Sequence, residues 1–359
     1  MKHRHAPAGI AHIAVSPVMA ALGAAFLFGG STPFAKVALG DVPPVLMAGL
    51  LFLGSGIGLS AAMLIRDRGF GNFRLPMKHL FWYLLSIGFG GVLAPVLLME
   101  GLARTGAAAA SMMLNTEAVF TVLLAWFAFR ENAGWRVVLG MALIIAGGTA
   151  LAWPSGDVGW EGMAGTLAIA AACLCWAIDN NLTRKVSEAD AMFVACGKGL
   201  AAGTINTALA VIGGAALPAT GAIGSAMLIG LFGYGISLAL FVVALRGLGT
   251  ARTGAYFATA PFIGAALSIA AFGDTVSGGF WAASALMGAG VWLHLTELHG
   301  HEHWHAPLEH THRHHHDRHH RHPHPFAWDG KEPHTHPHVH EEITHAHPHF
   351  PDIHHRHPH

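Results

Sequence analysis

The strongest constraint on the fold of this chain is an internal repeat. Residues 102–148 recur as residues 245–291, at a constant offset of 143 residues and without a gap. Each copy consists of two long apolar runs joined by a short polar turn, and identical residues recur along it, for example Thr116 and Thr259. A repeat made of membrane-length segments is typical of transporters that are built from two related halves.

Apolar runs continue on both sides of the repeat. The chain is 53% hydrophobic and 11% charged, whereas about a quarter of the residues of a soluble domain are charged. Runs of roughly 20 apolar residues can cross a bilayer as helices. The sequence predicts ten such runs, at residues 17–39, 44–65, 80–102, 105–129, 135–153, 162–182, 191–213, 222–244, 253–272 and 280–298. The predicted fold class is therefore an all-α integral membrane protein with ten transmembrane helices in two five-helix repeats.

The distribution of Lys and Arg predicts the orientation of these helices. With the N-terminus in the cytoplasm, twelve Lys and Arg residues of the N-terminal segment and of the segments between the runs fall on the cytoplasmic side, and Arg104 alone falls on the other side. Both termini are therefore expected on the cytoplasmic side of the cell's inner (plasma) membrane. Because each repeat has an odd number of helices, the two repeats are expected to be inverted relative to each other.

This pattern divides the chain into four parts. They are a cytoplasmic N-terminal segment at 1–16, a first repeat at 17–153, a second repeat at 160–298 and a cytoplasmic tail at 299–359.

Short motifs in both halves resemble the drug/metabolite transporter superfamily, in its ten-helix form with two EamA-type repeats. In that family each half opens with a helix of the pattern apolar-Trp-Gly-Ser-Asn-Phe. At the corresponding places this chain has FGGSTPF at residues 28–34 and CWAIDNN at residues 175–181. The first half therefore has Gly29 where the family has Trp.

The fourth helix of each half carries a second motif of that family, a proline followed thirteen residues later by an acid at the turn. Pro261 and Asp274 keep this pattern. Glu131 keeps the spacing, with Ala118 in place of the proline. The resemblance covers roughly residues 17–298, and it implies a secondary transporter of the kind that often exports amino acids, metabolites or drugs.

Polar residues inside the apolar runs are the candidates for a translocation site, since a charge in hydrocarbon costs at least about 2.5 kcal/mol. Glu117 lies near the centre of the fourth run, beside Asn115 and Thr116. It could bind a cation or carry a coupling proton, and the alternative is a protonated or paired structural acid. Lys198 lies between two glycines in the seventh run. It could approach an anionic group, pair with Glu117 or Asp179, or extend to the membrane interface.

Further polar positions are expected either at the site or near the ends of the helices. Residues 179–181 form the most polar cluster in any run, and they are expected either to line a central cavity or to end a helix. Lys36 is either a site residue or a residue of the interface. Glu100 and Arg104, four residues apart, are expected to form an interfacial pair. The complete predicted substrate-binding set is Glu117, Lys198, Asp179, Asn180, Asn181, Asn115 and Lys36.

The chain changes character after residue 298. Of its 29 histidines, 24 lie in residues 298–359, and many alternate with other residues. Prolines interrupt this tail and apolar residues are few, so we expect it to be disordered. Closely spaced neutral imidazoles are good ligands for Zn, Ni, Co and Cu ions. The candidate ligands are His299, His301, His303, His305, His312, His314, His315, His316, His334, His336, His338 and His340.

The biological role of the tail stays open between several hypotheses. It could serve metal transport, store or sense metal in the cytoplasm, or act as a pH-dependent polycation. Unperturbed imidazoles have a pKa near 6.5, so mild acid would charge the tail and attract it to anionic lipid.

The predicted function is secondary transport of a small solute by alternating access, with export of a metabolite, amino acid or drug-like compound. No ATP-binding loop motif occurs, so the energy is expected to come from a gradient. The alternatives are a Zn, Ni or Co exporter that uses the tail, and a membrane-anchored metal-binding or sensing protein. We expect no enzymatic activity, no required cofactor and no nucleic-acid partner. The expected partners are a small-molecule substrate, membrane lipid, transition-metal ions and a second copy of the chain in a homodimer.

Overall fold

A computed structural model divides the chain into two units, Met1–Glu297 and Leu298–His359. The residues that the structure describes are 16–67, 77–129, 135–153, 160–183, 191–296, 299–305, 308–314, 334–340 and 343–349.

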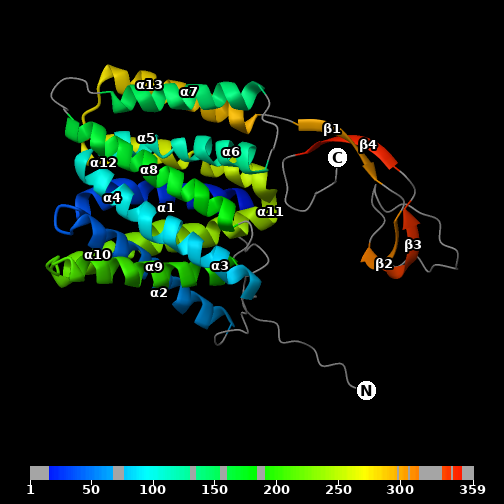
Figure 1. The fold of residues 1–359 in the computed structure, drawn as a ribbon, viewed down its shortest axis with the longest axis horizontal. Coiled ribbons are helices and arrows are strands. Elements are labelled where there is room, and N and C mark those ends of the chain that lie inside the picture. Colours follow the sequence, from blue (N-terminus) through cyan, green and yellow to red (C-terminus); the bar gives the residue numbers. More distant parts are fainter. Residues whose placement is uncertain are drawn as a thin grey trace. The chain divides into compact units, whose positions relative to one another are not determined.

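The first unit is a bundle of helices (Figure 1). They are α1 (Pro17–Ala38), α2 (Pro44–Asp67), α3 (Met77–Ser86), η1 (Ile87–Leu93), α4 (Ala94–Arg104), α5 (Ala107–Met113), α6 (Thr116–Phe129), α7 (Trp135–Ala152), α8 (Trp160–Thr183), α9 (Ala191–Ile212), α10 (Thr220–Gly230), η3 (Leu231–Ile236), α11 (Ser237–Phe257), α12 (Ala260–Phe272) and α13 (Gly278–Leu295).

The ten predicted runs correspond to these helices, some of which follow one another within a single run. Within the described residues, eight helical stretches are long and apolar enough to cross a membrane. The ninth run instead contains a chain turn followed by the 13-residue helix α12, and the tenth is the 18-residue helix α13. Proline at the start of α1 and α12 suits the first turn of a helix, where the backbone N–H groups have no partner within the helix and the missing N–H of proline costs no hydrogen bond.

The structural repeat is longer than the repeat in the sequence. The π-helical segments η1 and η3 lie at equivalent places, since an offset of 143 residues carries 87–93 onto 230–236. Two interruptions of the helices, at Leu114–Asn115 and at Ala258–Thr259, are related by nearly the same offset, 144 residues. π-Helical turns are rare and often mark functional sites.

The two repeats are inverted. Lys36, near the end of α1, donates to the carbonyl oxygen of Leu102 at 2.6 Å. A Cβ placed on Gly165, near the start of α8, would lie 2.8 Å from the side chain of Thr105. The end of the first helix of one repeat and the start of the first helix of the other therefore both lie beside the end of α4. Figure 1 also shows the start of α1 and the end of α13 at the same end of the bundle.

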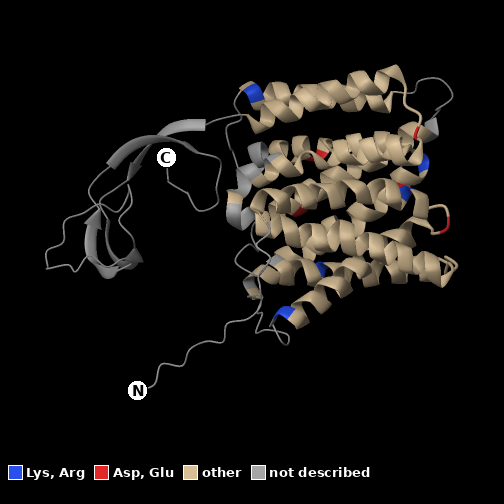
Figure 2. Ribbon diagram, turned by 180° about the vertical axis from the view of Figure 1, so that it is seen from behind, with Lys and Arg blue, Asp and Glu red and all other residues tan. Residues whose placement is uncertain are grey.

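Small residues bring helices of the two repeats into close contact. Between α2 and α9, a Cβ on Gly203 would lie 2.5 Å from the backbone nitrogen of Leu53, and one on Gly199 would lie 2.9 Å from Gly56 Cα. Such backbone contact is typical of membrane helices. Large apolar side chains cover the outside, and Figure 2 shows most charged residues near the helix ends, with few in the middle of the bundle. This surface suits a lipid environment.

The tail contains four strands, β1 (His299–His305), β2 (Leu308–His314), β3 (His334–His340) and β4 (Ile343–His349). β1 pairs with β4 and β2 pairs with β3, both antiparallel. The prediction of disorder from composition did not anticipate these strands, because it ignored the alternation of histidines, which has the two-residue period of a strand. For the rest of the tail, disorder stays a prediction. The candidate ligands His315 and His316 lie outside the described residues.

Candidate functional site

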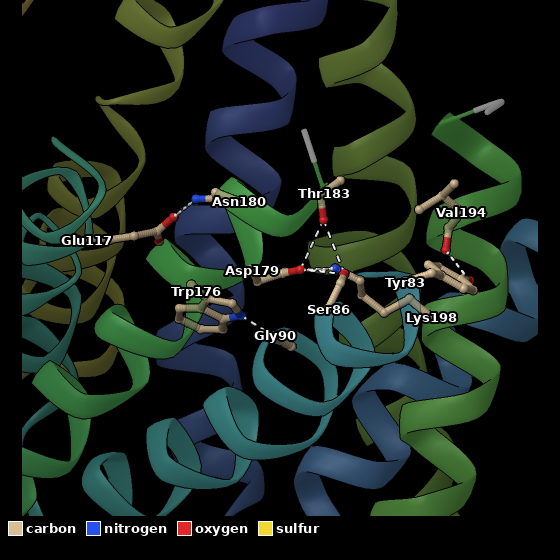
Figure 3. Close-up of polar contacts among 10 residues, drawn as sticks. All are labelled: Tyr83, Ser86, Gly90, Glu117, Trp176, Asp179, Asn180, Thr183, Val194 and Lys198. Atoms are coloured by element: carbon tan, nitrogen blue, oxygen red, sulfur yellow. Dashed lines mark hydrogen bonds and ion pairs between the residues drawn. The ribbon is translucent and has the colours of Figure 1, made fainter. Parts of the chain in front are cut away.

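A buried ion pair lies where α8 and α9 approach the end of α3 (Figure 3). Lys198 Nζ donates to both carboxylate oxygens of Asp179, at 2.6 and 2.7 Å. The two side chains are only 15% and 10% exposed. Because an unpaired charge is costly in such surroundings, each residue compensates the other. The ammonium group of Lys198 is therefore held inside the bundle by Asp179.

Two hydroxyl groups complete the hydrogen bonds of this carboxylate. Ser86 Oγ donates to Asp179 Oδ1 at 2.6 Å, and Thr183 Oγ1 donates to the same oxygen at 3.0 Å. Ser86 belongs to the first repeat, while the ion pair belongs to the second. The pair is therefore anchored across the boundary between the repeats.

A second acid lies close to the pair but has a different environment. Asn180 Nδ2 donates to Glu117 Oε1 at 2.8 Å, and this bond also joins the two repeats (Figure 3). Among the described residues Glu117 has no cationic partner. It is the second residue of α6, directly after the interruption at Leu114–Asn115, and the start of a helix favours a negative charge. This carboxylate can therefore accept a proton or a cation.

The π-helical segment η1 forms the wall beside the ion pair. Its wide turns leave carbonyl oxygens that accept hydrogen bonds from side chains of the second repeat. Trp176 Nε1 donates to Gly90 O at 3.1 Å, and the fully buried Asn206 donates to Gly91 O at 3.3 Å and to Val92 O at 3.4 Å. These bonds explain how an irregular backbone is tolerated at membrane depth, where unpaired polar groups are expensive.

Gly90 provides the first test of this geometry. A Cβ at this position would contact the carboxylate of Asp179, whereas a Cβ on Gly88, in the same segment, would have no atom within 4 Å. Gly90→Ala is therefore expected to lower the free energy of unfolding by about 1–3 kcal/mol through overpacking. Gly88→Ala serves as the matched control and should leave that free energy nearly unchanged or slightly raised. Denaturant unfolding of the purified protein in detergent measures both, and equal behaviour of the two variants would contradict the packing described here.

Further contacts join the repeats near the two ends of the bundle. Near the end of α12, Asp274 Oδ2 accepts from the backbone N–H of Ala108 at 2.9 Å and from Ser268 Oγ at 2.6 Å. Toward the opposite end, Tyr83 Oη donates to Val194 O at 2.9 Å. Asp274 is the turn acid of the second repeat, and its counterpart Glu131 lies outside the described residues.

The structure brings together four of the seven predicted site residues, namely Glu117, Asp179, Asn180 and Lys198. Asn115 and Asn181 instead donate to backbone carbonyls of nearby turns, at 2.9 and 2.8 Å. Lys36 lies apart from the cluster, because its ammonium group is bound by the carbonyls of Leu102 and Ala103 at the end of α4. A helix C-terminus favours a positive charge there. The function of all seven residues in transport stays a prediction.

Sequence reasoning missed several partners in this cluster, chiefly Ser86, Thr183 and Asn206. A hydroxyl group in a membrane helix does not indicate a partner on another helix, because it can donate a hydrogen bond to the backbone of its own helix. The buried amide of Asn206 could have been found, since an uncompensated amide in an apolar run also requires a partner. Among the described residues of the helical bundle, no group of three or more His, Cys, Asp or Glu side chains is arranged to hold a metal ion.

Comparison with known proteins supplies an independent finding. The profile described as the EamA-like transporter family matches residues 15–152 and 163–296. The chain is 28% identical over 259 residues to a protein of Methanothermobacter thermautotrophicus named uncharacterized transporter, which covers 67% of this chain and 75% of that protein. It is 24% identical over 277 residues to the uncharacterized inner membrane transporter YedA of Escherichia coli, covering 74% and 87%.

A shorter match has a more specific name. Over 153 residues the chain is 30% identical to the probable amino-acid metabolite efflux pump of Salmonella typhimurium, covering 43% of this chain and 48% of that protein. A solved crystal structure of a protein aligns with a TM-score of 0.58 at 22% identity, covering 78% of this chain and 96% of that one. At this identity the likeness shows the fold alone.

Proposed function

Because the chain belongs to the EamA-like transporter family, we propose that this multi-pass membrane transporter exports a small amino-acid-like metabolite by alternating access. The observation that carries the proposal is the ion pair between Asp179 and Lys198, with Glu117 beside it, at the boundary between two inverted repeats. Transporters of this architecture bind their substrates near mid-membrane at the repeat interface.

The ion pair favours a substrate that carries both charges. If the pair opens, Lys198 can bind a carboxylate and Asp179 can bind an ammonium group. A zwitterion replaces both partners at once, so no charge stays buried and unpaired. A solute with a single charge would leave one of the two residues without a partner. The relative named as a probable amino-acid metabolite efflux pump supports the same substrate class.

Contacts near both ends of the bundle support alternating access. The bond between Asp274 and Ala108 joins the repeats near one end, and the bond between Tyr83 and Val194 joins them toward the other. In the proposed cycle the contacts at the two ends of the bundle break in turn, so that the central site is exposed to one side of the membrane at a time.

The proposal also covers the coupling ion and the orientation of the chain in the membrane. Glu117, an intramembrane acid without a cationic partner among the described residues, is the proposed carrier of a coupling proton. Both termini are proposed to face the cytoplasm, because twelve Lys and Arg residues of the N-terminal segment and the loops fall on that side and Arg104 alone on the other. The relative named as an inner membrane transporter supports the inner membrane as the location of this protein.

Counterflow in vesicles that contain the purified protein tests the substrate class. Vesicles loaded with an unlabelled neutral amino acid should take up the labelled amino acid, because exchange of one for the other needs no ion gradient. The unmodified amino acid should compete with the label. The N-acetylated amino acid lacks the ammonium charge and the methyl ester lacks the carboxylate, so both should compete poorly.

Two results would contradict the proposal. If both single-charge analogues competed as well as the zwitterion, the ion pair would not select the substrate. If the protein exchanged uncharged drug-like solutes and no amino acid, the substrate class would be wrong.

A further inference from the structure

The paired strands of the tail place histidines opposite histidines. In the first ribbon, formed by β1 and β4, the facing pairs are His299 with His349, His301 with His347, and His303 with His345. In the second ribbon, formed by β2 and β3, they are His310 with His338, His312 with His336, and His314 with His334. The two strands of each ribbon, although far apart in the sequence, therefore carry histidines at facing positions.

Strand geometry gathers these residues on one face of each ribbon. Residues two apart along a strand share a face, as do residues directly opposite each other on neighbouring strands. Seven histidines thus lie on one face of the first ribbon, namely His299, His301, His303, His305, His345, His347 and His349. Seven lie on one face of the second, namely His310, His312, His314, His334, His336, His338 and His340.

The backbone spacing suits a small metal ion. Opposite Cα atoms of an antiparallel pair are about 4.5–5.5 Å apart, and the next residue on the same face lies about 7 Å along the strand. Two neighbouring pairs therefore bring the Cα atoms of four histidines to the corners of a small rectangle. The three or four nitrogen ligands that a zinc ion requires are available within one such group.

We infer that each ribbon is a binding site for a divalent transition-metal ion of the zinc, nickel or cobalt kind. The donors on the histidine face are imidazole nitrogens, and the other residues on it are Ile343 and Leu308. Glu302 and Glu309 fall at positions of the opposite face. Calcium and magnesium prefer oxygen ligands, whereas imidazole suits zinc, copper and nickel.

Metal binding and strand pairing are expected to support each other. The paired segments are far apart in the chain, so pairing requires closure of a long loop. A two-stranded ribbon is at best marginally stable in water, and an ion bound by both strands stabilises the paired form. This inference concerns the tail alone and does not depend on the proposed transport.

Zinc titration of the purified full-length protein tests the inference. A fluorescent chelator that competes for Zn²⁺ reports affinity and stoichiometry at neutral pH. The first variant combines His345→Gln, His347→Gln and His349→Gln, which removes one member of every facing pair of the first ribbon. The control combines His319→Gln, His320→Gln and His322→Gln, which removes the same number of histidines outside the four described strands.

The first variant is expected to lose about half of the tightly bound zinc, with affinity at those sites reduced by roughly tenfold or more, since even outer partners of metal ligands contribute about that much. A variant with His334→Gln, His336→Gln and His338→Gln should lose the other half. The control should bind as the natural chain does. Equal losses in the strand variants and the control would overturn the inference, because they would show diffuse binding along a flexible tail.

Discussion

Replacing Asp179 with asparagine is expected to abolish transport and to lower the free energy of unfolding by roughly 3–5 kcal/mol, because Lys198 then stays buried without its counter-charge. Lys198 Nζ donates to both oxygens of this carboxylate, at 2.6 and 2.7 Å, so one substitution weakens both bonds. Denaturant unfolding in detergent measures the stability, and amino-acid counterflow in vesicles measures the transport.

The double variant with Asp179→Asn and Lys198→Met separates these two effects. It leaves no unpaired charge, and replacing both members of a buried pair is often neutral or stabilising. We therefore expect most of the lost stability to return while transport stays absent, since a zwitterion then finds neither charge. A double variant that transports at the natural rate would reduce the pair to a structural role.

Ser86→Ala is the matched control for that series. It removes the hydroxyl that donates to Asp179 Oδ1 at 2.6 Å but keeps both charges. The expected loss of stability is about 1.5–3 kcal/mol, the usual net value of a hydrogen bond to a charged group. Transport should persist in this variant, so its loss there would show that positioning of the pair matters as much as its charge.

The ten apolar runs predicted the positions of the helices because the cost of backbone polar groups in lipid leaves a spanning segment almost no other structure. The first run, predicted at 17–39, ends at Ala38 in the structure. Hydropathy averages over many residues, however, and is insensitive to a single turn. The segments η1 and η3 and the interruption before α12 therefore could not be read from the apolar pattern.

In the candidate site, too, the sequence predicts contacts within one helix but not contacts between helices. The pairing of Glu100 with Arg104 follows from a four-residue spacing on one helix, and the structure confirms it at 3.0 Å. The cost of a buried charge identified Asp179 and Lys198 as residues that need partners. Their choice of each other depends on the packing of α8 against α9 and α3, which no spacing in the sequence specifies.

Glu117→Gln is expected to stop accumulation of solute driven by a pH gradient while exchange of labelled for unlabelled solute continues. The glutamine side chain has nearly the same volume and keeps an oxygen that can accept from Asn180 Nδ2, which donates to Glu117 at 2.8 Å. The change therefore removes little besides the ionisable group. A gradient of one pH unit supplies about 1.4 kcal/mol for each coupled proton and supports about tenfold accumulation. The natural chain should approach this ratio in vesicles, and the variant should show none.

Asn180→Ala separates the proton from the hydrogen bond, because it removes the donor and keeps the acid. Accumulation should continue in this variant if the carboxyl group itself carries the proton. A Glu117→Gln protein that lost exchange and accumulation together would place this residue in solute binding instead of coupling. If it accumulated solute as the natural chain does, Glu117 would lie outside the transport cycle, and the driving ion would have to bind elsewhere. The distinction matters physically, since Asp179 and Lys198 already neutralise each other, and Glu117 is the acid of this cluster whose charge the described residues leave uncompensated.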